Sequence, residues 1–119
     1  MNFANLRYAT VQRQCEWPGA ENITPSFRGL ELAGEVGEAC NVVKKLERAR
    51  LGLSGSRSTV EALSEELADI IICTDLLAME YGIDLWDSVI KKFNASSDKL
   101  GLKTKLSDVI TMSENEDEV

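Results

Sequence analysis

Two acidic stretches decide how this chain is expected to fold: Glu31-Leu-Ala-Gly-Glu35-Val-Gly-Glu38 and Glu65-Glu66-Leu-Ala-Asp69-Ile-Ile-Ile72. Each stretch sets carboxylates three residues apart, and side chains at that spacing share one face of a helix. Each also lies in an apolar pattern that should pack into a core, where a carboxylate is costly unless a cation or a hydrogen-bond partner compensates it. Two such pairs facing each other would form a cage of four carboxylates, a kind of site that suits Mg²⁺.

The apolar periodicity predicts an all-α fold, with a protomer that resembles a four-helix bundle. The expected helices cover residues 2–16, 25–50, 58–81 and 84–98. The expected N-caps are Thr24 before a proline, Ser58 or Thr59, and Asp84. The predicted core stripes are Leu32, Val36, Ala39, Val43 and Leu46 in the second helix, and Val60, Leu63, Leu67, Ile70, Thr74 and Leu77 in the third. The third helix is apolar around nearly its whole circumference, so we expect a homodimer or homotetramer.

Composition limits the partners and the location. The 119 residues fit one helical domain over residues 1–106, followed by an acidic tail over 107–119 that we expect to be disordered. The net charge is −7, and no basic stripe exists to bind a nucleic acid polymer. No apolar run approaches the roughly 20 residues of a membrane span. The first residues lack the layout of a signal peptide, so a cytoplasmic protein is expected.

The missing residue types narrow the chemistry. The chain has no histidine, which excludes a Ser-His-Asp triad and an ExxH di-iron site. Its three cysteines are widely spaced, so a zinc site is not expected. Any metal would therefore be held by oxygen ligands, which favours Mg²⁺, Mn²⁺ or Ca²⁺.

A glutamate pair at this spacing is more often a solvated helix face, and three details argue against that reading here. Asp69 precedes three consecutive isoleucines, so its surroundings are expected to be apolar. Aspartate is also disfavoured inside helices. The acidic pairs have no obvious basic partners one turn away, and unpaired like charges destabilise a helix.

The order and spacing of these residues resemble the MazG family of all-α nucleoside triphosphate pyrophosphohydrolases, whose signature is EExxE followed by ExxD. Glu35-Val-Gly-Glu38 and Glu66-Leu-Ala-Asp69 carry the resemblance, which extends over residues 25–100 and includes Gly82-Ile-Asp84 and Lys92-Phe93. Residues 33–39 are most similar to the compact single-domain members of bacteria and phages. The resemblance implies four metal ligands, namely Glu35, Glu38, Glu66 and Asp69.

One residue departs from that signature. Gly34 stands where the family has its first glutamate, and Glu31, one helical turn before Glu35, is a candidate for the missing carboxylate. Gly34 and Gly37 lie in the middle of a helix, where glycine costs about 1 kcal/mol relative to alanine. Such glycines mark close approach either of another helix or of a ligand, and both explanations stay open.

The resemblance also implies a reaction, namely hydrolysis of a nucleoside triphosphate to the monophosphate and pyrophosphate. Mg²⁺, with Mn²⁺ as a substitute, would bridge the acidic cage and the phosphates and lower the pKa of the attacking water. With no histidine available, Glu38 or Glu31 is expected to accept the proton.

Candidate substrate contacts are Lys92, Lys99 and Asn94 for the phosphates and Trp17 for stacking on the base. The alternatives are ordinary surface lysines and an aromatic at the edge of the core. Two other functions are alternatives to this hydrolysis. One is phosphoribosyl-ATP pyrophosphohydrolase, and the other is a non-catalytic module for nucleotide binding or helical oligomerisation.

Overall fold

The computed structural model describes residues 3–107. Three of its four α-helices have a side-chain N-cap. The helices are α1 (Ala4–Glu16), α2 (Pro25–Arg50), α3 (Val60–Glu80) and α4 (Leu85–Lys99), and a short 3₁₀ helix, η1, covers Ala20–Asn22. The Oγ1 atoms of Thr24 and Thr59 accept hydrogen bonds from the backbone N–H groups of Phe27 and Ala62, at 3.2 and 3.1 Å. Asp84 caps α4 in the same way. The all-α prediction and the predicted caps are confirmed.

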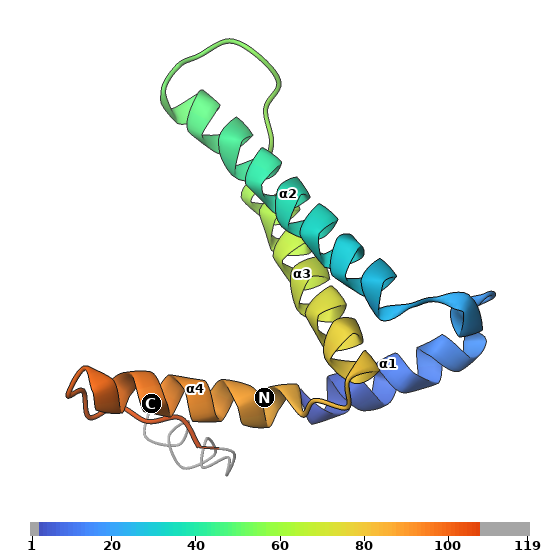
Figure 1. The fold of residues 1–119 in the computed structure, drawn as a ribbon. Helices are drawn as coiled ribbons and strands as arrows, with labels where there is room; N and C mark the ends of the chain where they lie inside the picture. Colours follow the sequence, from blue (N-terminus) through green and yellow to red (C-terminus); the bar gives the residue numbers. More distant parts are fainter. Residues whose placement is uncertain (1–2, 108–119) are drawn as a thin grey trace, which may run out of the picture.

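The helices form a hairpin with two arms at its base (Figure 1). Helices α2 and α3 run antiparallel along their lengths, and the loop over residues 51–59 joins them at the far tip. Helix α1 crosses the other end of α3, and α4 extends away from the hairpin. The Cα radius of gyration is 18.0 Å, whereas about 13.5 Å is typical of a compact domain of this length. One protomer is therefore an open arrangement of the four helices.

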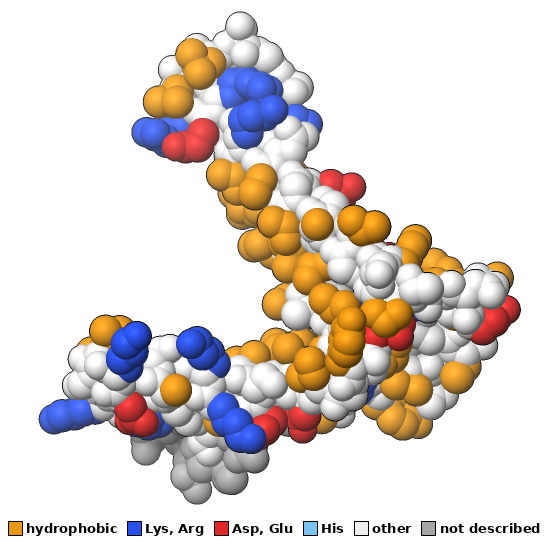
Figure 2. Space-filling model, in the orientation of Figure 1, with side chains coloured by type: hydrophobic (Ala, Val, Ile, Leu, Met, Phe, Trp, Pro, Cys, Tyr) orange, Lys and Arg blue, Asp and Glu red, His pale blue; other side chains and the backbone are white. Residues whose placement is uncertain are grey.

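The open shape leaves a small core and corrects several burial predictions. The buried apolar side chains among the described residues are Ala39, Val42, Cys73, Leu76 and Ala78. Of the predicted stripes, Val36, Val43, Val60 and Leu67 are instead 42–68% exposed. Their prediction as core residues is wrong for a single protomer because neither α1 nor α4 covers the upper part of the hairpin. Figure 2 shows apolar side chains along this surface and cationic ones around the hairpin tip.

Arg7 ties the base of the hairpin together. Its Nη2 lies 3.0 Å from Oδ1 of Asp75, a side chain with no solvent exposure. The same nitrogen donates to the backbone carbonyl of Ile83 at 2.8 Å. Arg7 thus links α1 to α3 and to the turn that leads into α4. Gly82 adopts φ +63° in this turn, a conformation that glycine reaches without strain.

Candidate metal and nucleotide site

Three carboxylates from the two hairpin helices meet in one group. Oxygen atoms of Glu35 and Glu38 on α2 and of Glu66 on α3 all lie within 4.8 Å of one another. The spacing of three residues puts the first two on one face of α2, and the antiparallel packing brings α3 opposite that face. This is the one such acidic group that residues 3–107 contain.

The electrostatics of the group favour a bound cation. One oxygen each of Glu35 and Glu66 is buried and has no hydrogen-bond partner among the described residues. Partial burial raises the pKa of Glu35, and the neighbouring carboxylates of Glu38 and Asp69 raise it further. Burial and the proximity of Glu38 and Asp69 likewise raise the pKa of Glu66. A divalent cation would relieve both the repulsion and the unpaired oxygens, and an all-oxygen donor set fits Mg²⁺.

Asp69 differs from the other three predicted ligands. Its side chain is exposed, so the expectation that apolar neighbours surround it is wrong. Of the three isoleucines that follow it, Ile70 and Ile72 are half-buried and Ile71 is exposed. Its charge nevertheless acts on Glu35 and Glu66, so it lies at the rim of the group rather than within it.

Glu31 lies one turn before Glu35 and connects the acidic group to a neighbouring cavity. One of its carboxylate oxygens lies 3.6 Å from Nη1 of the buried Arg28. On its other side is Cys73, whose pKa is raised to about 11 by burial and by the charges of Glu31 and Glu35. Glu31 thus lies between the guanidinium of Arg28 and the neutral thiol of Cys73, at the edge of both the acidic group and the cavity.

The cavity has a volume of about 230 Å³ and lies where α1 ends and α2 begins, against α3. Its lining combines aromatic, cationic and acidic side chains with the thiol: Arg13, Gln14, Trp17, Ile23, Phe27, Arg28, Glu31, Ile72, Cys73 and Leu76. Trp17 and Phe27 are about half exposed there, so their rings are accessible to a ligand. The structure therefore brings Trp17 and Glu31, which were predicted separately, to one cavity beside the carboxylates.

Of the residues that line the cavity, only Trp17 and Glu31 were predicted as site residues, and the polar or aromatic residues Gln14, Phe27 and Arg28 were not. Arg28 precedes Glu31 by three residues, a spacing that brings the two side chains together on a helix, and this signal could have been used. Gln14 and Phe27 have no comparable local signal, because the fold brings them together from different helices.

The predicted phosphate contacts lie on the other arm. Asn94 uses its amide to hold the chain after α4: it donates to the carbonyl of Leu106 at 2.8 Å and accepts from that residue's N–H at 2.6 Å. Lys92 lines a hollow on α4, and Lys99 is at the end of that helix. Since α4 extends away from the hairpin, one protomer does not bring these residues to the acidic group.

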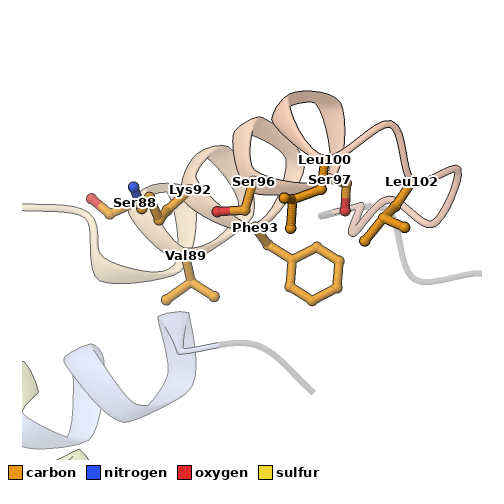
Figure 3. Close-up of a pocket in the computed structure, with 8 residues that line it drawn as sticks. All are labelled: Ser88, Val89, Lys92, Phe93, Ser96, Ser97, Leu100 and Leu102. Atoms are coloured by element: carbon orange, nitrogen blue, oxygen red, sulfur yellow. The ribbon is translucent and has the colours of Figure 1, made fainter.

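The hollow on α4 is larger than the cavity beside the carboxylates but lacks its chemistry. It measures about 560 Å³, and Figure 3 shows Val89, Phe93, Leu100 and Leu102 as its apolar lining. Apart from Lys92, its polar side chains are serines. It has no group of carboxylates and is better suited to apolar contact than to binding a triphosphate.

Gly34 is not required by packing within the protomer. A Cβ atom built at Gly34 or at Gly37 would meet no atom within 4 Å outside the local helix. Contact with another helix of the same described chain therefore does not explain either glycine. The space beside both glycines is open to a ligand or to a second molecule.

Comparisons with known proteins do not assign the chain to a family. No protein-family model, no curated protein and no solved structure matches it. Within the described part, none of the helices combines the length and apolar character needed to cross a membrane. The geometry and chemistry of the site are therefore the basis for a function.

Proposed function

We propose that this protein hydrolyses a nucleoside triphosphate to the monophosphate and pyrophosphate, with Mg²⁺ as the required ion. The observation that carries the proposal is the group formed by Glu35, Glu38 and Glu66, with its two buried and unpartnered oxygens, next to a cavity that contains Trp17. A triphosphate and an acidic group repel each other unless divalent cations lie between them. The acidic group and the aromatic cavity together suit a nucleotide bound through its metal and its base.

Each part of the site has a defined role in this proposal. Glu35, Glu38, Glu66 and the rim residue Asp69 would hold Mg²⁺. When bound, the ion neutralises the phosphates and makes water a better nucleophile toward the α-phosphorus. Glu38 or Glu31 accepts the proton of that water, since no histidine is present. Trp17 stacks on the base, and Phe27 provides a second aromatic surface.

The proposal includes a homodimer or homotetramer. Exposed apolar side chains occur on all four helices, among them Val11, Leu30, Leu67, Ile71 and Phe93. A surface this apolar is typical of a protein–protein interface. In an oligomer, Lys92 and Lys99 of α4 would approach the phosphates bound to a second copy, a contact that one protomer does not permit.

A panel of ribo- and deoxyribonucleoside triphosphates with Mg²⁺ tests the proposal. The expected result is release of pyrophosphate, without free phosphate, from at least one substrate, and loss of that release in EDTA. Phosphoribosyl-ATP belongs in the same panel, because its turnover in preference to the others would redirect the proposal to that substrate. Nucleotide binding without turnover of any substrate would indicate the non-catalytic module instead.

A further inference from the structure

Gln14 lines the cavity, and a hydrogen bond fixes the orientation of its side-chain amide. Its Oε1 accepts a hydrogen bond from Nη2 of Arg28 at 2.7 Å. Arginine has only donors, so the amide must direct its oxygen to Arg28 and its Nε2 away from it. The orientation of this amide is thus set by chemistry, although oxygen and nitrogen have nearly the same shape.

Arg28 is held firmly enough to impose that orientation. Its side chain is only 4% exposed, and it lies between carboxylates of two helices. Its Nη1 is 3.6 Å from Glu31 on α2, and its Nε is 3.6 Å from Glu80 on α3. A buried guanidinium with two carboxylates in reach keeps its position and its positive charge.

The free end of the Gln14 amide has no assigned partner. Among residues 3–107 its Nε2 donates to no group, and Gln14 lines the same cavity as Trp17 and Phe27. A base stacked on these aromatic rings would present its edge, and therefore its hydrogen-bonding atoms, to the wall of the cavity.

We propose that Gln14, oriented by Arg28, determines base specificity by favouring a base with a carbonyl oxygen over one with an amino group at the edge that it contacts. This inference depends on the proposed function. A carbonyl oxygen accepts a hydrogen bond from Nε2, whereas an exocyclic amino group is itself a donor and would be left facing another donor. A site built to pair with one group discriminates against an analogue that leaves its donor unpaired.

Two pairs of substrates test this directly, because the members of each pair differ at one such position. ITP and ATP differ at C6 of the purine, and UTP and CTP differ at C4 of the pyrimidine. For the wild type we expect kcat/KM to be about tenfold higher for the carbonyl member of the pair that fits the cavity, which corresponds to one hydrogen bond of ordinary strength.

Gln14→Glu replaces the Nε2 donor with an oxygen acceptor, and its other carboxylate oxygen can still accept the hydrogen bond from Arg28. We expect it to reverse the ratio in favour of the amino base, and Gln14→Leu to bring the ratio close to one. Gln12→Glu makes the same charge change at an exposed position of α1 and should leave the ratio unchanged. Circular dichroism would verify that all three variants are folded.

The outcomes separate this inference from the function on which it depends. Turnover with equal kcat/KM for both members of each pair, or a ratio that Gln14→Glu leaves unaltered, would overturn the role of Gln14 and leave the hydrolase intact. If no triphosphate is turned over, the proposed hydrolysis fails. In that case, calorimetry measures the dissociation constants of the same four nucleotides for the wild type and for Gln14→Glu. The ratio of these constants within each pair then tests the role of Gln14.

Discussion

At the scale of single residues, the arrangement of Glu35 and Glu66 is unfavourable without a cation. Each carboxylate has one buried oxygen without a partner, and each has other carboxylates close by. Their pKa values are raised above 4.5, so the folded chain holds protons that the unfolded chain would release. Ionisation of these groups near neutral pH therefore opposes folding, and the penalty is removed as the pH falls toward 4.5.

The first prediction concerns the stability of the metal-free protein. In EDTA, protonation of these two carboxylates should raise the melting temperature as the pH is lowered from 7 to 5. The reason is that these groups take up protons at a higher pH in the folded state than in the unfolded state. At pH 7, Mg²⁺ should raise the melting temperature, since it binds only the folded arrangement.

Glu35→Gln separates this effect from general acid sensitivity. The variant should melt at a higher temperature than the wild type in EDTA at pH 7 and should gain less from Mg²⁺. Glu21→Gln, which removes an exposed charge from η1, serves as the matched control and should behave like the wild type. A lower melting temperature for Glu35→Gln in EDTA would contradict the unfavourable electrostatics described for this group.

The second prediction concerns activity. Glu38→Gln and Asp69→Asn should each lower kcat/KM for the triphosphate by about 100-fold or more, because each removes a metal ligand or a proton acceptor. Asp69→Asn is the stricter test, because Asp69 is exposed and lies at the rim of the acidic group. Steady-state pyrophosphate release measures both, and wild-type activity in Asp69→Asn would remove that residue from the site.

At the scale of elements, the ion pair between Arg7 and Asp75 determines how α1 and the turn before α4 meet α3. The Asp75 carboxylate is fully buried, and Arg7 is its cation. A buried charge that loses its partner is costly, whereas replacement of both partners by apolar residues is often tolerated.

The third prediction follows from that difference. Arg7→Met should lower the free energy of unfolding by about 3 kcal/mol, and the double variant Arg7→Met/Asp75→Leu should regain most of it. Urea denaturation monitored by circular dichroism measures both. If Arg7→Met alone changed the stability by less than about 0.5 kcal/mol, the pair would have no structural role.

Local chemistry explains why the helices could be predicted. Thr24, Thr59 and Asp84 cap helices through bonds to residues three positions on, so the sequence contains the whole interaction. Residues that meet across helices were harder to predict. The contact of Arg28 with Gln14 depends on how the end of α1 meets the start of α2, which no local pattern encodes.

At the scale of the whole molecule, the main difference from expectation is exposure. Helical spacing and the family resemblance together predicted a group of Glu35, Glu38, Glu66 and Asp69, and the structure brings the first three within 4.8 Å of one another. Val60 and Leu67 were wrongly predicted to be buried because burial depends on which helix covers them, and in one protomer none does. The periodicity of a helix shows that a face is apolar but not whether the same chain covers it.

The fourth prediction is that a second copy covers this surface. Sedimentation equilibrium should give a mass of at least twice 13.1 kDa. Phe93→Asp, which puts a charge in the apolar hollow of α4, should shift the mass toward the monomer and lower kcat/KM, because Lys92 and Lys99 would no longer reach a neighbouring site. A stable, active monomer would contradict this arrangement.

We propose that water attacks the α-phosphorus, so that the bond between the α- and β-phosphates is broken. ³¹P NMR of the products formed in H₂¹⁸O tests this most directly. With Mg²⁺ and a triphosphate that the protein accepts, we predict resonances of the nucleoside monophosphate and pyrophosphate, with ¹⁸O only in the monophosphate. With Glu38→Gln, both products should form at least about 100-fold more slowly. Formation of the diphosphate and inorganic phosphate, or ¹⁸O in the pyrophosphate, would contradict attack at the α-phosphorus.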